Sequence, residues 1–436
     1  EAILAALFGA GSIGLRAVAT GLPASILLNP RRSLADACTS RERAQFVIWA
    51  TSGSGDPSNA NVPGTYDDPG IAHSLDPLMA PTPMTLGGQQ YTAAKPWASL
   101  PQSVLSRTCF FHHTTLTNSH ANESKVLKLM GGIKRQEMLV SLMAAKLAPC
   151  LGTVQAEPAS ISGEFITFGG RTLPALTPTG LRDVFISPKG ALTNLQKLRD
   201  ADLDRIYATL KQGGNASQLA YLDRMANSQR ELRNISDSLL GSLAGITAND
   251  LNGQMTAAVA LIQMGVAPTS VIQMPFGGDN HSDANLARET AQHVSSIAAI
   301  ATLQQKLTDA GLADRVTFVL MNVFGRTLNR PTRMGRDHLG NHHCTVIIGK
   351  GVRSSVIGGV VKSGSDYAAT AIDSRTGKPG VSADIRFEET LGAVGKTIGA
   401  AVGVSEEVLN DQITTGKIVR PEIGRASCRE RVSSPV

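Results

Sequence analysis

Two short segments of this 436-residue chain concentrate side chains that bind metal ions or transfer protons. They are Phe276-Gly-Gly-Asp-Asn-His-Ser-Asp283 and Arg336-Asp-His-Leu-Gly-Asn-His-His343, and four of the nine histidines lie in them. Carboxylates and imidazoles are the ligands that borderline divalent cations take in proteins. The two segments therefore predict one metal site, and its candidate ligands are Asp279, His281, Asp337, His338, His342 and His343.

Each segment also has a purely structural interpretation. Gly277 to Asn280 fits a tight turn, and Ser282 or Asp283 fits the cap of a following helix. The residues from Arg336 to His343 fit a solvated loop whose polar side chains bond its own backbone. For any one residue alone the structural interpretation is preferred, and it is the joint clustering of the histidines that favours a site.

A third polar segment, Thr51-Ser-Gly-Ser-Gly-Asp-Pro-Ser-Asn-Ala60, follows an apolar run. Asp56 offers another metal ligand, and Ser58 offers a hydroxyl whose pKa a metal would lower. Asn59 and Arg326, the latter in Phe324-Gly-Arg-Thr327, are suited to hydrogen-bond an anionic group. The alternative is an ordinary surface turn, since Gly-Asp-Pro is common turn chemistry. Together with the metal ligands, these residues predict phosphoryl or sulfuryl transfer.

The remaining histidines carry weaker signals. His120 is a secondary candidate in a polar loop, whereas His112 and His113 lie within or just past an expected strand. One of that pair is expected to be a core or edge residue. His293 falls in the middle of an expected helix, so we predict a structural role for it.

Elements that would position these residues alternate along the chain. Continuous apolar runs indicate strands buried on both faces, and apolar residues at helical spacing indicate helices. The pattern predicts strands at 45–50, 107–113, 269–274, 314–321 and 344–349, and helices at 123–148, 254–264, 283–310 and 387–401. Such alternation predicts one α/β domain over residues 38–421, with a doubly wound, mostly parallel sheet and helices on both faces. The candidate residues then follow strand ends, where α/β folds place their sites.

Residues 191–245 carry two amphipathic helical patterns separated by Gly213-Gly214. This predicts a helical hairpin inserted into the α/β domain. A cover over the sheet is the preferred role, and a membrane or partner contact is the alternative.

Charge and composition limit the partners. The net charge is +6, yet no block of five basic residues occurs and aromatic residues make up only 4% of the chain. We therefore expect no nucleic-acid binding. Dispersed positive charge favours an anionic substrate, either a small molecule or a polymer. The sequence gives no prediction of oligomeric state.

Both ends of the chain carry segments that we set apart from the fold. Residues 1–37 are apolar with an Ala35-Asp-Ala37 cleavage pattern, which predicts a partial export signal and a periplasmic or extracellular location. A transmembrane anchor or buried helix is the alternative, and Cys38 leaves a lipoprotein open. We expect no membrane span in the mature chain. Residues 422–436 are expected to be a translated sequencing-adapter artefact. Four cysteines in the remainder do not form a disulfide scaffold.

Three motifs in order, Gly277-Gly-Asp-Asn-His281, Phe324-Gly-Arg-Thr327 and Arg336-Asp-His-Leu-Gly-Asn-His342, resemble an uncharacterised family of exported bacterial proteins. This family, domain of unknown function 1501, often carries twin-arginine signals, and Gly11 to Pro23 is similar to them. It belongs to the alkaline phosphatase/sulfatase-like superfamily, and the resemblance extends to about Pro421. It implies a sulfatase-like fold with a dinuclear metal site at strand ends, and its candidate ligands are Asp56, Asp279, His281, Asp337, His338 and either His342 or His343.

Two departures from the family pattern bear on function. Asn322-Val323 stands where the family often has an acidic residue, and Gly55 to Asn59 has no clear nucleophile motif. The resemblance implies an exported, metal-dependent hydrolase of phosphate or sulfate esters that uses Zn, Mn or Ca. The departures keep open an alternative, a non-catalytic cell-envelope binding protein with a degenerate metal site.

Overall fold

The computed structural model describes residues 41–161, 163, 165–186, 237–329, 334–380 and 383–420, together with isolated positions between 202 and 219. The expected export signal at 1–37, the tail at 422–436 and most of the expected hairpin at 191–245 lie outside these residues. Across the described part, no helix is both long enough and apolar enough to span a bilayer.

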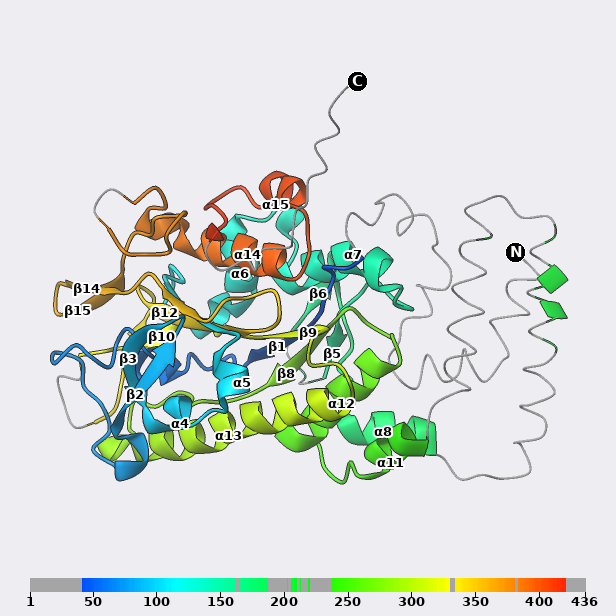
Figure 1. Cartoon of the computed structure of the whole chain (residues 1–436), viewed down its shortest axis with the longest axis horizontal. Coiled ribbons are helices and arrows are strands. Elements are labelled where there is room, and N and C mark those ends of the chain that lie inside the picture. The colour runs from blue at the N-terminus through cyan, green and yellow to red at the C-terminus, as the bar shows by residue number, and fades with distance from the viewer. Residues whose placement is uncertain are drawn as a thin grey trace, which may run out of the picture.

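A seven-stranded sheet forms the centre of the molecule (Figure 1). Its strands, in spatial order, are β13 (Ser355–Ile357), β4 (Thr108–His113), β12 (His343–Ile348), β9 (Val316–Leu320), β1 (Phe46–Thr51), β8 (Thr269–Gln273) and β5 (Ala159–Ser160). Only β12 runs antiparallel to its neighbours within this sheet. The predicted mostly parallel α/β sheet is therefore confirmed.

Helices cover both faces of this sheet (Figure 1). Along β1, Phe46, Ile48 and Ala50 belong to one buried cluster, which includes residues of α12 (Leu251–Gln263) and α13 (Ala287–Asp309). The alternate residues Val47 and Trp49 belong to a second cluster with α7 (Leu139–Leu151) and α14 (Thr390–Ala401). A strand buried on both faces has no polar side to alternate with, which explains its continuous apolar run.

The remaining elements are short and lie around this core. They are η2 (Pro57–Ala60), η3 (Pro77–Met79), β2 (Pro81–Leu86), β3 (Gln89–Ala94), α4 (Lys95–Ala98), α5 (Gln102–Leu105), η4 (His120–Asn122), α6 (Glu123–Leu127), η5 (Leu129–Gly131), η6 (Lys134–Gln136), β6 (Thr167–Phe168), β7 (Arg171–Thr172), α8 (Pro178–Ile186), α11 (Asp237–Ala244), η7 (Ala284–Leu286), β10 (Gly325–Arg326), β11 (His338–Leu339), β14 (Val360–Ser363), β15 (Asp366–Ala369), η8 (Phe387–Glu389) and α15 (Glu406–Gln412).

The single helix expected over 123–148 is wrong. The chain instead forms α6, two short 3-10 turns and then α7. Met130 has a left-handed backbone with φ of 54°, so a continuous α-helix cannot pass through it. Pro149 lies inside α7 rather than closing it, and the helix ends at Gly152, whose left-handed φ of 68° suits a C-terminal cap.

Strand direction gathers the polar segments at one edge of the sheet. β1, β8 and β9 run parallel, so their following loops leave from the same edge. β12 runs in the opposite direction and therefore begins at that edge, directly after the histidine-rich segment. This edge holds the candidate site.

Candidate metal centre

Asp279 is the centre of a cluster of acidic and imidazole side chains contributed by three segments. Its Oδ1 lies 3.0 Å from His281 Nε2 and 3.8 Å from His338 Nε2, and its Oδ2 lies 3.7 Å from His120 Nε2. The Nε2 atoms of His281 and His338 are 2.8 Å apart. In His120, Asp279 and His338, the potential ligand atoms all lie within 4.8 Å of one another. We call Asp279 and these three histidines the Asp279 cluster.

The other ring nitrogen of each histidine faces an acceptor. His281 Nδ1 is 2.9 Å from Asp337 Oδ1, His338 Nδ1 is 2.5 Å from the Asn118 carbonyl, and His120 Nδ1 is 3.2 Å from the Gly53 carbonyl. Carbonyl and carboxylate oxygens only accept, so each Nδ1 carries the ring proton. In the neutral rings every Nε2 is then an acceptor, and all three Nε2 atoms lie within 3.8 Å of the Asp279 carboxylate.

Electrostatics keep two members of the Asp279 cluster in the forms that bind metal. Burial raises the pKa of Asp279, but the Arg326 guanidinium outweighs it and the net pKa lies below the usual value. Burial lowers the pKa of His338, and the neighbouring Arg326, His120 and His281 lower it further, against the hydrogen bond to Asn118. A deprotonated carboxylate and neutral imidazole are the states that a cation requires.

Arg326 holds Asp279 in place. Its guanidinium is fully buried and donates to Asp279 Oδ1 at 2.8 Å, to the Ser54 carbonyl at 2.6 Å and to the Gly55 carbonyl. Nη1 also lies 3.3 Å from His281 Nε2. The structure thus places Arg326 as a support for the cluster, with its donors directed at protein acceptors rather than at an external anion.

A buried ion pair fixes the segment that carries Asp337 and His338. Arg336 Nε donates to Glu289 Oε2 at 2.8 Å, and both side chains are completely buried. Burial raises the pKa of Glu289, but the ion pair with Arg336 outweighs this and holds the pKa below its usual value. Glu289 belongs to the first turns of α13, so the pair ties the second motif to the helix that follows the first.

Among the described residues, Asp56 and Asn59 bond groups next to the Asp279 cluster rather than its side chains. Asp56 is buried and accepts from the Phe276 and Gly278 amides at 3.0 and 2.5 Å and from the Ser52 hydroxyl. The bonds from the two amides join the loop after β1 to the loop after β8. Burial raises the pKa of Asp56, against these hydrogen bonds. The Ser58 hydroxyl is buried without a hydrogen-bond partner among the described residues. Asn59 bonds the Arg326 backbone.

His342 and His343 also lie apart from Asp279. They form a separate, fully buried group with His112 and His113, at the ends of β12 and β4. His342 stacks on His112 with ring centroids 5.2 Å apart, and His343 Nε2 accepts from the Asn322 amide at 3.1 Å. Burial lowers the pKa of all four rings, to about 4 for His112 and His113.

Asn322 presents an amide at the position where the resemblance led us to expect an acidic residue. Its Oδ1 accepts from the Ser52 amide at 2.8 Å, the Ser52 hydroxyl at 3.2 Å and the Thr51 hydroxyl at 3.4 Å. Val323 is buried in the apolar core. Among the described residues, this position therefore adds no charge that would hold a second cation.

His120 is the cluster member that the sequence ranked too low. The signal was its place in the loop after β4, a strand whose C-terminal end lies at the same sheet edge as the β1 and β8 loops. The Asn118 and Gly53 carbonyls that orient the rings could not be predicted from residue type, because every residue has a backbone carbonyl.

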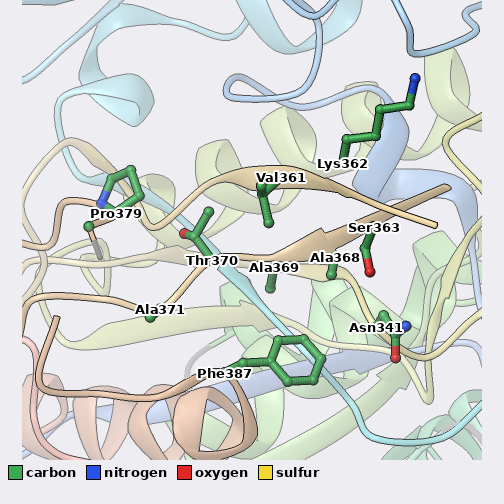
Figure 2. A pocket seen from close by; sticks show the side chains of 11 residues that line it. Asn341, Val361, Lys362, Ser363, Ala368, Ala369, Thr370, Ala371, Pro379 and Phe387 are labelled. Atoms are coloured by element: carbon green, nitrogen blue, oxygen red, sulfur yellow. The ribbon is translucent and has the colours of Figure 1, made fainter. Parts of the chain in front are cut away.

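An open hollow of 620 Å³ lies beside the β14–β15 hairpin (Figure 2). Val361, Ala369, Pro379 and Phe387 line it, with Lys362 and Asn341 among the polar residues. No member of the Asp279 cluster lines this hollow. Its largely apolar lining offers no ligand set, so the chemistry points to the Asp279 cluster instead.

Comparisons with solved structures give only weak likenesses. Solved structures that align with the chain include PsFucS1 sulfatase from Pseudoalteromonas sp., at 10% identity and TM-score 0.32, over 86% of this chain and 71% of that chain. Another is Ps i-CgsB in complex with k-i-k-neocarrahexaose, at 9% identity and TM-score 0.31, over 87% and 75%. Likenesses this low carry no argument about this chain. The curated proteins contain no match.

A family model described as "Protein of unknown function (DUF1501)" matches residues 188–376, somewhat less than half of the chain. This range contains the three motifs on which the resemblance was based, at 277–281, 324–327 and 336–342. It also contains every residue of the Asp279 cluster except His120. Over this segment the chain is similar to the DUF1501 family.

Proposed function

We propose that this protein is an exported, divalent-metal-dependent hydrolase of phosphate or sulfate esters, with its metal bound by the Asp279 cluster. The observation that carries the proposal is the convergence of three imidazole lone pairs on one carboxylate. Without a cation, lone pairs of His281 and His338 facing each other at 2.8 Å repel. A cation bound by both nitrogens, on the side of the Asp279 carboxylate, would replace that repulsion with two bonds.

The distances support such a fit. In a tetrahedral site with ligand bonds of about 2.1 Å, neighbouring ligand atoms lie about 3.4 Å apart. The separations around Asp279 Oδ1 are 3.0 and 3.8 Å, whereas His281 Nε2 and His338 Nε2 are closer, at 2.8 Å. His120, Asp279 and His338 form the group whose ligand atoms all lie within 4.8 Å of one another. Histidine ligands usually donate their second nitrogen to a carboxylate or a backbone carbonyl, and all three rings do so. Three imidazoles and one carboxylate favour Zn or Mn over Ca, which prefers oxygen ligands.

The residues around the metal position suggest separate tasks. A bound divalent cation would supply a Lewis acid for an ester oxygen and lower the pKa of a water molecule. Asp337 would hold the tautomer of His281, and Arg326 would keep Asp279 ionised. The formal charge of +6 favours an anionic substrate.

Metal content tests this proposal. Purified protein should hold about one equivalent of a divalent metal by mass spectrometry. Asp279→Ala and His338→Ala should each reduce the bound metal at least tenfold. Asp309→Ala is the matched control, because that carboxylate is at the far end of α13, about 33 Å along the helix from its start. Wild-type protein that takes up no divalent metal would contradict the proposal.

A second function is favoured by Asn322 and by the buried Ser58. Both are compatible with a cell-envelope protein that binds an anionic polymer without turning it over. A screen of aryl phosphate and aryl sulfate esters separates the two functions. Turnover that disappears in Asp279→Ala but persists in Asp309→Ala supports the hydrolase. Metal binding without turnover of any ester supports the binding protein.

A further inference from the structure

The histidines outside the Asp279 cluster form a directional chain of hydrogen bonds. His112 Nε2 lies 2.9 Å from the Pro63 carbonyl, so that nitrogen carries the proton and His112 Nδ1 is a lone pair. His342 Nε2, 2.9 Å from His112 Nδ1, must then donate. His342 Nδ1 is therefore a lone pair, and it lies 3.2 Å from the Asn59 amide nitrogen.

Asn59 uses the rest of its amide on the backbone of Arg326. Its Oδ1 accepts from the Arg326 N–H at 2.9 Å, and its Nδ2 donates to the Arg326 carbonyl at 2.9 Å. The second hydrogen of Nδ2 is free to donate to His342. Every donor in the chain Asn59–His342–His112–Pro63 thus has an acceptor, and the three side chains are completely buried.

Arg326, whose backbone Asn59 holds, positions the proposed metal centre. Arg326 belongs to β10, and it pairs in register with His338 of β11. The adjoining Thr327 amide donates to the Asp337 carbonyl at 2.9 Å. The Arg326 side chain holds Asp279. A shift of β10 would therefore move Asp279 and His338 together.

We infer that Asn59 and His342 are positioning residues, which set the metal ligands by clamping the backbone of Arg326. This inference rests on the proposed metal site and assigns Asn59 a different role from anion binding. Both rings of the chain must be neutral, since an extra proton on either one would set two N–H groups against each other. Burial, which lowers the pKa of His112 to about 4, keeps that ring neutral.

Three variants test the inference. His342→Leu removes the ring that orients Asn59, and His342→Gln restores one acceptor and one donor. His113→Leu is the matched control. His113 is equally buried, but its partners are Thr114 and Thr345, which do not belong to the hydrogen-bond chain from Asn59 to Pro63. The readouts are zinc affinity by competition titration and hydrogen exchange of the Arg326 amide. Unfolding in urea corrects the exchange rates for global opening.

We expect His342→Leu to weaken zinc binding and to speed exchange of the Arg326 amide, each at least tenfold. His342→Gln should stay within about threefold of wild type in zinc affinity and in exchange rate. His113→Leu should lower the free energy of unfolding without changing either quantity. Equal results for His342→Leu and His113→Leu would overturn the inference. If wild type binds no metal while the Arg326 amide still responds to His342→Leu, the proposed function fails, and the clamp on the Arg326 backbone stands without a metal to position.

Discussion

A neutral histidine has one N–H and one lone pair, so the partner of one nitrogen decides what the other can bind. In the Asp279 cluster, Asp337, Asn118 and Gly53 take the N–H groups of three rings. In the buried group, Pro63 takes the N–H of His112. The same residue type therefore forms a ligand set in one place and a structural chain in the other.

Asp337 provides a test at the residue scale. Its side chain is 77% exposed, so Asp337→Ala should leave the fold intact. The His281 ring loses its orienting carboxylate, and we expect zinc affinity to fall about 10- to 100-fold. A competition titration with a chromophoric chelator measures this, with Asp309→Ala as control. An unchanged affinity would show that His281 needs no orientation or binds no metal.

At the scale of elements, the two-residue strand β10 links the sheet edge to the site. It fits only because residue 325 is glycine. A Cβ there would lie 2.2 Å from the His342 carbonyl oxygen and 2.7 Å from Asn59 Cγ. The Phe-Gly-Arg-Thr motif thus combines a glycine that permits close approach with an arginine that reaches Asp279.

Gly325→Ala should accordingly destabilise the protein. Both contacts are with buried residues, so we expect a loss of about 1–3 kcal/mol in the free energy of unfolding. Gly241→Ala is the control, because this glycine lies in α11 with open space around it. That change should stabilise the protein by about 0.5–1 kcal/mol. Urea unfolding measures both, and equal values for the two variants would refute the close-approach argument.

At the scale of the molecule, the fold carries a pH dependence. His112, His113 and His293 are fully buried, and burial lowers the pKa of each to about 4. The unfolded chain binds these protons near the ordinary histidine pKa of about 6.5. Between those values the unfolded state holds more protons, so stability falls as the pH drops from about 6.5 towards 4.

The expected loss is large. Each fully buried ring contributes on the order of 3 kcal/mol across this window, and a typical domain has about 5–15 kcal/mol in total. The protein should therefore unfold in mild acid, with no such loss above pH 7. Urea unfolding at several pH values between 4 and 8 measures the slope. His113→Gln should reduce the slope by about one proton, whereas a flat profile in wild type would contradict neutral burial.

The amino-acid sequence alone determined the sheet and the edge at which the site forms. Apolar runs such as 46–51 specify strands buried on both faces, and parallel strands deliver their following loops to one edge. This is why residue types and spacing suffice to group Asp279, His281, Asp337 and His338. The helix expected over 123–148 shows the limit, because a left-handed turn at Met130 leaves no periodic signal.

Only the tertiary structure decided which polar residues share a site. His338 and His342 are four residues apart, yet one faces Asp279 and the other faces His112 and Asn59. Their separation follows from the pairing of β11 with β10, whereas His342 directly precedes β12 of the central sheet. Backbone carbonyls set the ring tautomers, and a carbonyl belongs to every residue type. The sequence therefore specified which side chains were available, and long-range packing specified their partners.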